Sequence, residues 1–110
     1  MKLGFLLGYS GKHIHIPVEL IKQAESIGYD SVWTAEAYGN DSVTTATWVL
    51  ANTEKIRVGT AIMQMPARTP AMCAMTARLT EPLTERVEVK VKGKTLILFL
   101  RPTRLQTKSY

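Results

Sequence analysis

The chain has little cysteine and no long hydrophobic run, and both absences narrow its class. Cys73 is the one cysteine among 110 residues, which excludes an intrachain disulfide framework and indicates a reducing compartment. The apolar run at residues 3–8 is shorter than the about 7–15 residues of a signal peptide's hydrophobic region. No run approaches the about 20 apolar residues of a membrane span. We therefore expect a cytoplasmic protein without membrane partners.

An excess of either charge is missing from the first two-thirds of the chain. Residues 1–77 contain six basic and six acidic residues, whereas residues 78–110 contain eight basic and three acidic ones. The net charge of +5 therefore belongs entirely to the last third. We divide the chain accordingly into a segment at 1–77 and a divergent basic tail at 78–110.

The first segment begins with alternating strand and helix signals. Residues 2–7 form a short apolar stretch without helical spacing, which predicts a buried strand. A helix is predicted from Pro17 to Ile27, because apolar residues recur on one face and proline suits a first helical turn. Gly28 is expected to end this helix with a positive φ. A second short strand is predicted at residues 31–35.

The same alternation continues along the segment. Asp41 is the predicted N-cap of a second helix that ends near Ala51, and a third strand is predicted at residues 55–63. Thr69 as N-cap and Pro70 at the first helical position open a third helix. The order β-α-β-α-β-α implies an α/β fold whose parallel strands are joined by right-handed crossovers.

The basic tail has a strand pattern of its own. Valines alternate with charged residues at 87–92, residues 92–94 suit a tight turn, and residues 95–100 form an apolar strand, which together predict a β-hairpin. The basic side chains could neutralise the phosphates of a nucleic acid. The aromatic residues of the tail are Phe99 and Tyr110, too few for a stacking platform. Nucleic-acid binding is therefore disfavoured against a solvated strand face.

Three strand ends are the places where such a fold would bind a ligand, since ligands bind at the carboxyl ends of parallel strands. These ends are Gly8–Tyr9, residues 36–38 and residues 63–65. Glu36 is the one acid among them. Directly after an apolar strand, it could accept a hydrogen bond from a ligand or hold a proton at neutral pH. The alternative is an exposed loop glutamate, or one paired with a neighbouring backbone N–H.

Other chemistry-bearing residues give weaker patterns. His13 and His15 share one side of an extended segment, but a closed zinc site needs four ligands and no familiar spacing completes it. We expect surface or loop histidines and no metal site. Residues 93–95 look like the end of a phosphate-binding loop, but position 88 is glutamate where the first glycine is required. Cys73 is expected to be a packing residue.

Four stretches of the first segment occur together in order and at natural spacing. They are Lys2–Phe5, Ala24–Trp33, Ala35–Gly39 and Gly59–Met72. In this combination the chain resembles the beginning of the bacterial luciferase-like monooxygenase family, most closely its coenzyme F-420 branch. The resemblance implies a (β/α)8 TIM barrel that binds a reduced flavin or deazaflavin at the C-terminal face of its strands. It also implies an oxidoreductase that uses coenzyme F-420, with FMN as the alternative, and a small-molecule substrate.

The resemblance implies roles for individual residues as well. Glu36 takes the place of an acidic residue near the cofactor ring and is the implied catalytic residue. Ala37 stands where some members have a histidine, so proton chemistry of that histidine does not carry over. Gly8 and Tyr9 would line the floor of the cofactor pocket.

A further carried-over site lies in the third strand. Thr60, Ala61 and Ile62 match the place where the family has a non-prolyl cis peptide behind the cofactor ring, and the resemblance puts that bond between Ala61 and Ile62. Such a bond costs about 3–4 kcal/mol and persists only where the surroundings enforce it. In a chain this short we expect the trans form.

The tail departs from the family pattern. The Gly-rich end of the family's fourth strand is missing, and residues 78–82 intervene. A complete barrel needs about 200 residues or more, so we expect an incomplete TIM barrel with three of eight strands, followed by the hairpin. Little or no turnover is expected from such a chain. The alternative is a non-catalytic fragment or interaction module that self-associates through exposed strand edges.

Overall fold

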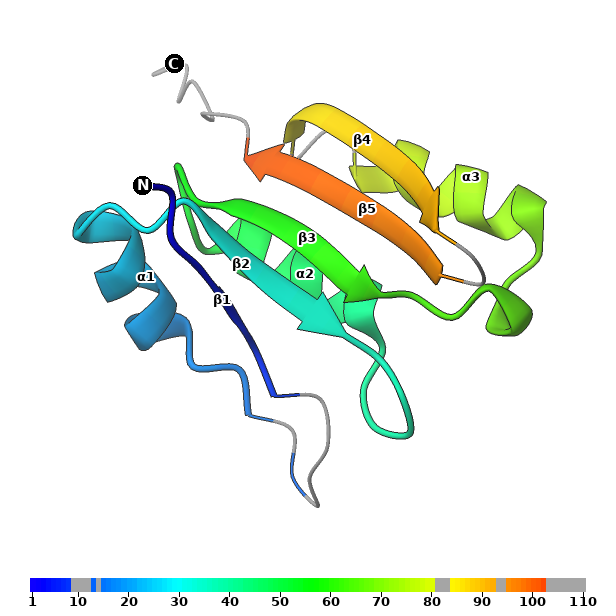
Figure 1. Cartoon of the computed structure of the whole chain (residues 1–110), viewed down its shortest axis with the longest axis horizontal. Coiled ribbons are helices and arrows are strands. Elements are labelled where there is room, and N and C mark those ends of the chain that lie inside the picture. The colour runs from blue at the N-terminus through cyan, green and yellow to red at the C-terminus, as the bar shows by residue number, and fades with distance from the viewer. Residues whose placement is uncertain (9–12, 14, 81–83, 93–94, 103–110) are drawn as a thin grey trace, which may run out of the picture.

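The computed structural model describes residues 1–8, 13, 15–80, 84–92 and 95–102. A five-stranded sheet with the strand order β1-β2-β3-β5-β4 runs through it, and helices connect its first strands (Figure 1). The elements in chain order are β1 Gly4–Leu6, α1 Val18–Ser26, β2 Ser31–Ala35, α2 Ser42–Ala51, β3 Arg57–Ile62, η1 Met65–Ala67, α3 Pro70–Thr80, β4 Thr84–Lys92 and β5 Thr95–Pro102.

The first three strands are parallel neighbours joined by α1 and α2. Phe5 of β1 lies opposite Val32 of β2, and Val32 in turn lies opposite Val58 of β3. The predicted strand–helix alternation of an α/β fold with parallel strands is confirmed over this part. The structure adds the short 3-10 helix η1, which the sequence pattern does not predict.

The core lies between the parallel strands and the two helices that connect them. Ile21 of α1 packs in one cluster with side chains of α2 and of the strands. Because both helices contribute to one cluster, they cover the same face of the sheet, as right-handed crossovers require. The buried members of the cluster are Leu7, Ile21, Val32, Ala46, Val49, Leu50, Ile56 and Val58.

Local signals set the helix ends at the predicted places. The Asp41 side chain accepts a hydrogen bond of 2.6 Å from Thr44 N, which caps α2. Thr69 Oγ1 accepts one of 3.1 Å from Met72 N at the start of α3. Gly28, after α1, has a φ of +95°, a conformation that favours glycine. Within the described ranges, none of the helices is long and apolar enough to cross a membrane.

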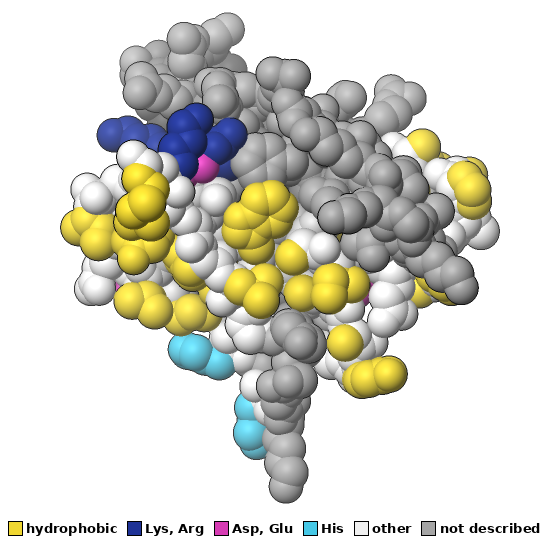
Figure 2. Space-filling model, in the orientation of Figure 1, with side chains coloured by type: hydrophobic (Ala, Val, Ile, Leu, Met, Phe, Trp, Pro, Cys, Tyr) yellow, Lys and Arg dark blue, Asp and Glu magenta, His cyan; other side chains and the backbone are white. Residues whose placement is uncertain are grey.

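The face of the sheet opposite α1 and α2 carries hydrophobic side chains. Leu6 and Trp33 are register neighbours on this face, and Leu6 is 54% exposed. Gly4 lies on the same face, and a Cβ there would stand 2.4 Å from Ser31 Oγ, so the close strand contact requires glycine. Figure 2 shows hydrophobic side chains on the face toward the viewer, over the parallel strands.

Strands β4 and β5 extend the sheet beyond β3. β5 pairs antiparallel with β3, where Val58 lies opposite Leu100, and β4 pairs antiparallel with β5 along most of its length. Of the exposed strand edges that the self-association alternative requires, the edge of β3 is therefore occupied in part, because β5 pairs with it at Val58 and Gly59. Residues 93–94, where the predicted turn falls, lie outside the described residues. The hairpin and the division after residue 77 stay predictions.

Candidate functional site

The carboxyl ends of β1, β2 and β3 meet along one edge of the sheet, because the three strands are parallel. Gly8 lies beyond β1, Glu36 follows β2, and Met63 follows β3. The backbone N–H of Glu36 donates to Ile62 O at 3.1 Å, which ties the ends of β2 and β3 together. This edge is where the sequence places the candidate ligand site.

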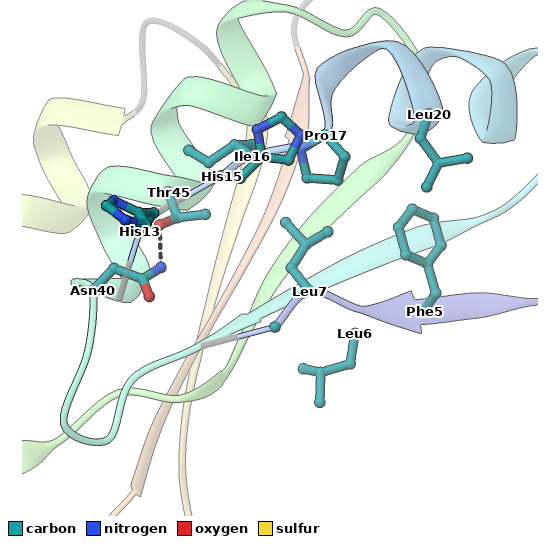
Figure 3. Close-up of a pocket in the computed structure, with 11 residues that line it drawn as sticks. Phe5, Leu6, Leu7, His13, His15, Ile16, Pro17, Leu20, Asn40 and Thr45 are labelled. Atoms are coloured by element: carbon teal, nitrogen blue, oxygen red, sulfur yellow. Dashed lines mark hydrogen bonds between the residues drawn. The ribbon is translucent and has the colours of Figure 1, made fainter. Parts of the chain in front are cut away.

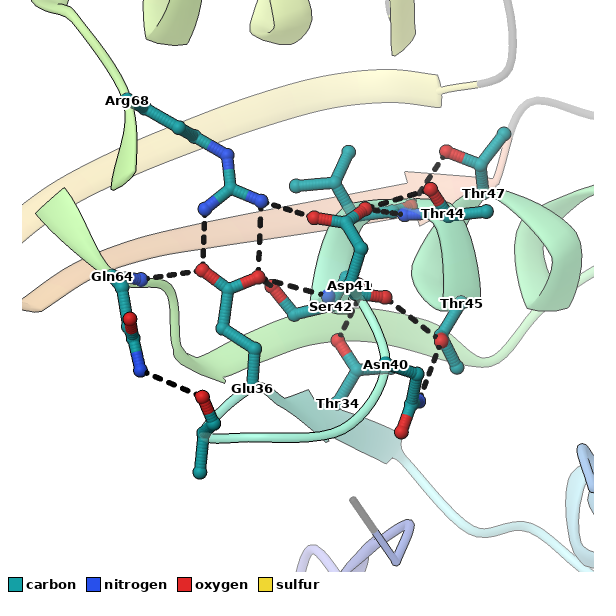
Figure 4. A network of polar contacts seen from close by, with 12 residues as sticks. Thr34, Glu36, Asn40, Asp41, Ser42, Thr44, Thr45, Thr47, Gln64 and Arg68 are labelled. Carbon is teal, nitrogen blue, oxygen red and sulfur yellow. Dashed lines mark hydrogen bonds and ion pairs between the residues drawn. The ribbon is translucent and has the colours of Figure 1, made fainter. Parts of the chain in front are cut away.

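The Glu36 carboxylate is buried and accepts hydrogen bonds from two connections of the chain (Figure 4). Ser42, at the start of α2, donates both its backbone N–H and its hydroxyl to Oε2, each at 3.1 Å. Gln64, just after β3, donates its backbone N–H to Oε1 at 2.6 Å. Of the alternatives that the sequence leaves open, pairing with backbone N–H groups is found, and an exposed loop glutamate is wrong.

Arg68 joins the carboxylates of Glu36 and Asp41. Its Nη1 pairs with Glu36 Oε1 and its Nη2 lies 3.0 Å from Glu36 Oε2, a bidentate arrangement. Nη2 also pairs with Oδ1 of Asp41, the N-cap of α2. The side chains of Arg68 and Glu36 are 13% and 10% exposed, so solvent screens this ion pair weakly.

The network fixes the charge of Glu36. Burial by itself raises the pKa of this carboxyl, but the hydrogen bonds from Arg68 and from the backbone of Ser42 and Gln64 favour the charged form and lower the pKa to about 2. The pKa of Arg68 is raised, chiefly by its hydrogen bond to Glu36. Glu36 is therefore a carboxylate at neutral pH, and the expectation that it could hold a proton there is wrong.

A cavity of about 330 Å³ opens at the end of β1, beside the start of α1 and the β2–α2 loop (Figure 3). Asn40 and Thr45 contribute polar groups to its wall, and Asn40 Nδ2 donates to Thr45 Oγ1 at 3.1 Å. Thr45 Oγ1 in turn donates to Asp41 O at 3.0 Å, so the cavity and the Glu36 network share the first turn of α2. The lining residues are Phe5, Leu6, Leu7, Gly8, His13, His15, Ile16, Pro17, Leu20, Asn40 and Thr45.

Comparison with known proteins identifies the family to which the chain belongs. The sequence profile of the luciferase-like monooxygenase family matches residues 3–85, most of the chain. The chain belongs to the luciferase-like monooxygenase family. It is 44% identical over 85 residues to a Mycobacterium tuberculosis protein provisionally named as a coenzyme F-420-dependent oxidoreductase, and the resemblance drawn from the four stretches is confirmed.

The share of each protein that is aligned limits what can be concluded from these matches. The match to the mycobacterial protein covers 76% of this luciferase-like chain and 24% of the relative, so the chain spans about a quarter of that relative's length. No solved structure gives a significant match. Activity, substrate and partners of the whole relative are therefore matters for proposal.

The residues expected at the pocket floor of this luciferase-like chain are described in part. Gly8 lines the cavity, whereas Tyr9 lies outside the described residues. His13 and His15 line the cavity too and are exposed, which confirms the expected surface position of the histidines. Among the described residues, no group of three or more His, Cys, Asp or Glu side chains could hold a metal ion.

Thr60, Ala61 and Ile62 do not share one surface. Thr60 is buried, and its register partner Thr34 donates Oγ1 to Ser42 O at 2.9 Å on the side covered by α2. Ala61 faces the opposite side, because successive side chains alternate along a strand, and Ile62 is 40% exposed. The peptide bond between Ala61 and Ile62 is trans, as expected for the short chain, and no cis bond occurs in the described part.

Sequence reasoning missed Arg68, which completes the Glu36 network. It lies 32 residues after Glu36 and follows η1, so no local spacing connects the two. One signal could have found it. An acid at the end of one parallel strand and a base just beyond the end of the next are brought to the same edge of the sheet by the topology.

Proposed function

We propose that this chain forms part of the cofactor and substrate site of a flavin- or deazaflavin-dependent oxidoreductase, with coenzyme F-420 preferred over FMN. Membership of the luciferase-like monooxygenase family and the name of the mycobacterial relative support this proposal. The observation that carries it is the position of the cavity at the carboxyl end of β1, beside the β2–α2 loop, on the edge of a parallel sheet where folds of this kind bind ligands. Bound there, the cofactor would supply the ring carbon that gives or takes a hydride.

The described wall fits the ring of such a cofactor better than its phosphate. Leu7 and Ile16 offer apolar surface for a flat ring, and the Asn40 amide offers a hydrogen-bonding group. The described lining residues include neither Lys nor Arg, and both terminal nitrogens of Arg68 bind carboxylates. We infer that these residues hold the ring, and that the phosphate contacts come from other parts of the protein.

In this proposal Glu36 orients the pocket and does not transfer a proton. Its carboxylate is ionised and is held by Ser42 and Arg68. Through Ser42 it fixes the first turn of α2, whose Thr45 accepts a hydrogen bond from Asn40 of the preceding loop; both residues line the cavity. The proton that accompanies a hydride transfer would then come from another group or from the substrate.

We expect little or no turnover from the chain as it stands. The chain spans 24% of its relative, and three of the described strands are parallel where a barrel of this kind has eight. Barrel strands are covered on both faces, whereas Leu6 remains 54% exposed on the inner face here. We infer an incomplete barrel with a part-formed site, in which cofactor binding precedes any competence for chemistry.

The test is a titration of the purified chain with oxidised F-420 and, separately, with FMN, followed by cofactor fluorescence and by co-elution in gel filtration. Saturable binding is expected, tighter for F-420 than for FMN. Binding should be lost in Gly8→Leu, because a Cβ at Gly8 meets no described atom within 4 Å and the larger side chain can enter the cavity. Ala51→Leu, at an exposed position of α2, is the matched control.

Two results would contradict the proposal. Failure of both cofactors to bind the folded chain would mean that the family sequence is present without a formed site. Unchanged F-420 affinity in Gly8→Leu would mean that the cavity is not the binding place. Steady-state oxidation of reduced F-420 by the purified monomer would overturn the expected lack of turnover.

A second candidate function is a self-associating module. It is favoured by the hydrophobic face formed by Leu6 and Trp33, which α1 and α2 leave uncovered. Sedimentation velocity over a wide concentration range should then show a dimer that Leu6→Lys weakens. A chain that stays monomeric at every concentration would exclude this candidate.

A further inference from the structure

Two connections of the chain meet at the Arg68 guanidinium at the C-terminal edge of the sheet, the β2–α2 connection and the one between β3 and α3 (Figure 4). Glu36 directly follows β2, Asp41 directly precedes α2, and Arg68 lies between η1 and α3. Two carboxylates thus share one guanidinium whose side chain is 13% exposed. Without the cation, the buried Glu36 carboxylate would keep its charge beside Asp41 with no opposite charge, which is costly although Asp41 itself is 42% exposed.

We propose that Arg68 is the positioning residue of the pocket edge: it holds Glu36 and the first turn of α2 in one arrangement and thereby sets the cavity wall that this turn carries. The importance of that wall rests on the proposed function, whereas the positioning itself rests on the contacts of Arg68. Arg68 acts through Glu36 and Asp41 and has no assigned contact with a cofactor.

The path from Arg68 to the cavity runs through Asp41. Its Oδ1 pairs with Arg68, its Oδ2 accepts Thr44 N at 2.6 Å, and its backbone O accepts Thr45 Oγ1 at 3.0 Å. Thr45 accepts the Asn40 amide at 3.1 Å, and both of these residues line the cavity. A substitution of Arg68 should therefore change the positions of Asn40 and Thr45 in the cavity wall, because hydrogen bonds connect them to Asp41.

The charged and titratable groups that face Arg68 come from three elements. They are Glu36 after β2, Asp41 at the N-cap of α2 and Cys73 of α3, and the two carboxylates favour the charged guanidinium. A lysine could supply the charge but not the two parallel donors that match the Glu36 carboxylate. The two terminal nitrogens of Arg68 therefore fix the orientation of the Glu36 carboxylate as well as balancing its charge.

The test follows the Glu36 carboxyl by carbon NMR during a pH titration of the full chain and of Arg68→Met. In the wild type the pKa of Glu36 should be about 2, and in Arg68→Met it should rise, because the buried carboxyl then loses the hydrogen bonds and the charge of Arg68. The backbone amides of Ser42 and Thr44 should exchange with solvent roughly tenfold faster or more in the variant.

Arg57→Met is the matched control for loss of an ion pair. Arg57 pairs with Asp30, and their side chains are 23% and 24% exposed at the opposite end of β3. This variant should leave the titration of Glu36 unchanged. A Glu36 pKa that stays near 2 in Arg68→Met, or that rises equally in Arg57→Met, would overturn the positioning role.

A double variant keeps the test decisive if Arg68→Met does not fold. Glu36→Gln combined with Arg68→Met leaves no unpaired carboxylate at position 36, so it should fold and unfold at a higher urea concentration than Arg68→Met alone. A double variant as unstable as the single one would overturn a role that acts through Glu36. Failed F-420 binding by the wild type, with the NMR results as expected, would instead overturn the proposed function alone.

Discussion

The carboxylate of Glu25, near the end of α1, accepts three successive backbone N–H groups from the connection between α2 and β3. Glu54 N lies 3.0 Å, Lys55 N 2.7 Å and Ile56 N 2.7 Å from Oε2. This set of three hydrogen bonds, called here the Glu25 cradle, connects α1 to the residues that precede β3. Replacement of Glu25 by alanine should therefore destabilise the fold, although the residue lies far from the candidate site.

The size of the loss follows from the contacts of Glu25. A hydrogen bond to a charged acceptor contributes about 1.5–3 kcal/mol. Because the three N–H groups share one carboxylate at a partly exposed place, we take about 2 kcal/mol for the set. Removing a negative charge near the C-terminus of a helix offsets this by about 0.3–1 kcal/mol. The net loss is about 1.5 kcal/mol, which lowers Tm by about 6–12 °C.

The assay is urea and thermal unfolding of Glu25→Ala, followed by circular dichroism. Glu19→Ala is the matched control on the same helix, because Glu19 lies in the first turn and forms an exposed contact of 3.7 Å with Lys22. It should cost well under about 1 kcal/mol. The helix dipole alone predicts the reverse order, in which Glu25→Ala stabilises the chain and Glu19→Ala weakens it. That reverse order would refute the cradle argument.

Two further predictions concern pH and strand packing. Since the pKa of Glu36 falls from 4.5 to about 2 on folding, its contribution, about 3 kcal/mol, is present above pH 4.5 and is lost as the pH falls toward 2. Urea midpoints should decline in this window, and a Glu36→Gln variant that declines equally would contradict the assignment. Gly4→Ala should cost about 1–3 kcal/mol, because its Cβ would lie 2.4 Å from Ser31 Oγ. Gly8→Ala, whose Cβ meets no described atom within 4 Å, should be near neutral, and equal urea midpoints for the two alanine variants would rule out the crowding at Gly4.

The elements that the sequence predicts well depend on neighbours in the chain. The strand at residues 31–35 and the helix from Asp41 to Ala51 occur at the predicted bounds, because an apolar run and an N-cap are signals of a few residues. The positive φ of Gly28 is confirmed for the same reason. The parallel order of the strands follows from this alternation, since connections of this kind have one hand.

The features that the sequence does not predict depend on residues far apart in the chain. The charge of Glu36 is set by Arg68, 32 residues away, together with Gln64. Burial after an apolar strand was a sound reason to expect a raised pKa, and the donors reverse its sign. The pairing of β5 with β3 is likewise non-local, and the alternating pattern of the tail predicts strands without saying where they attach.

The Glu36 network can form without a closed barrel. The hydrogen bonds of the network join residues between 36 and 68, a continuous stretch that follows β2 and contains α2, β3 and η1. The hydrophobic face that includes Leu6 has the opposite character, because burying it needs a second layer of structure. A luciferase-like chain can therefore form an ordered strand-end edge, with one wall of the proposed ligand site, although the opposite face of the sheet is uncovered. For that reason cofactor affinity reports on this chain more directly than turnover does.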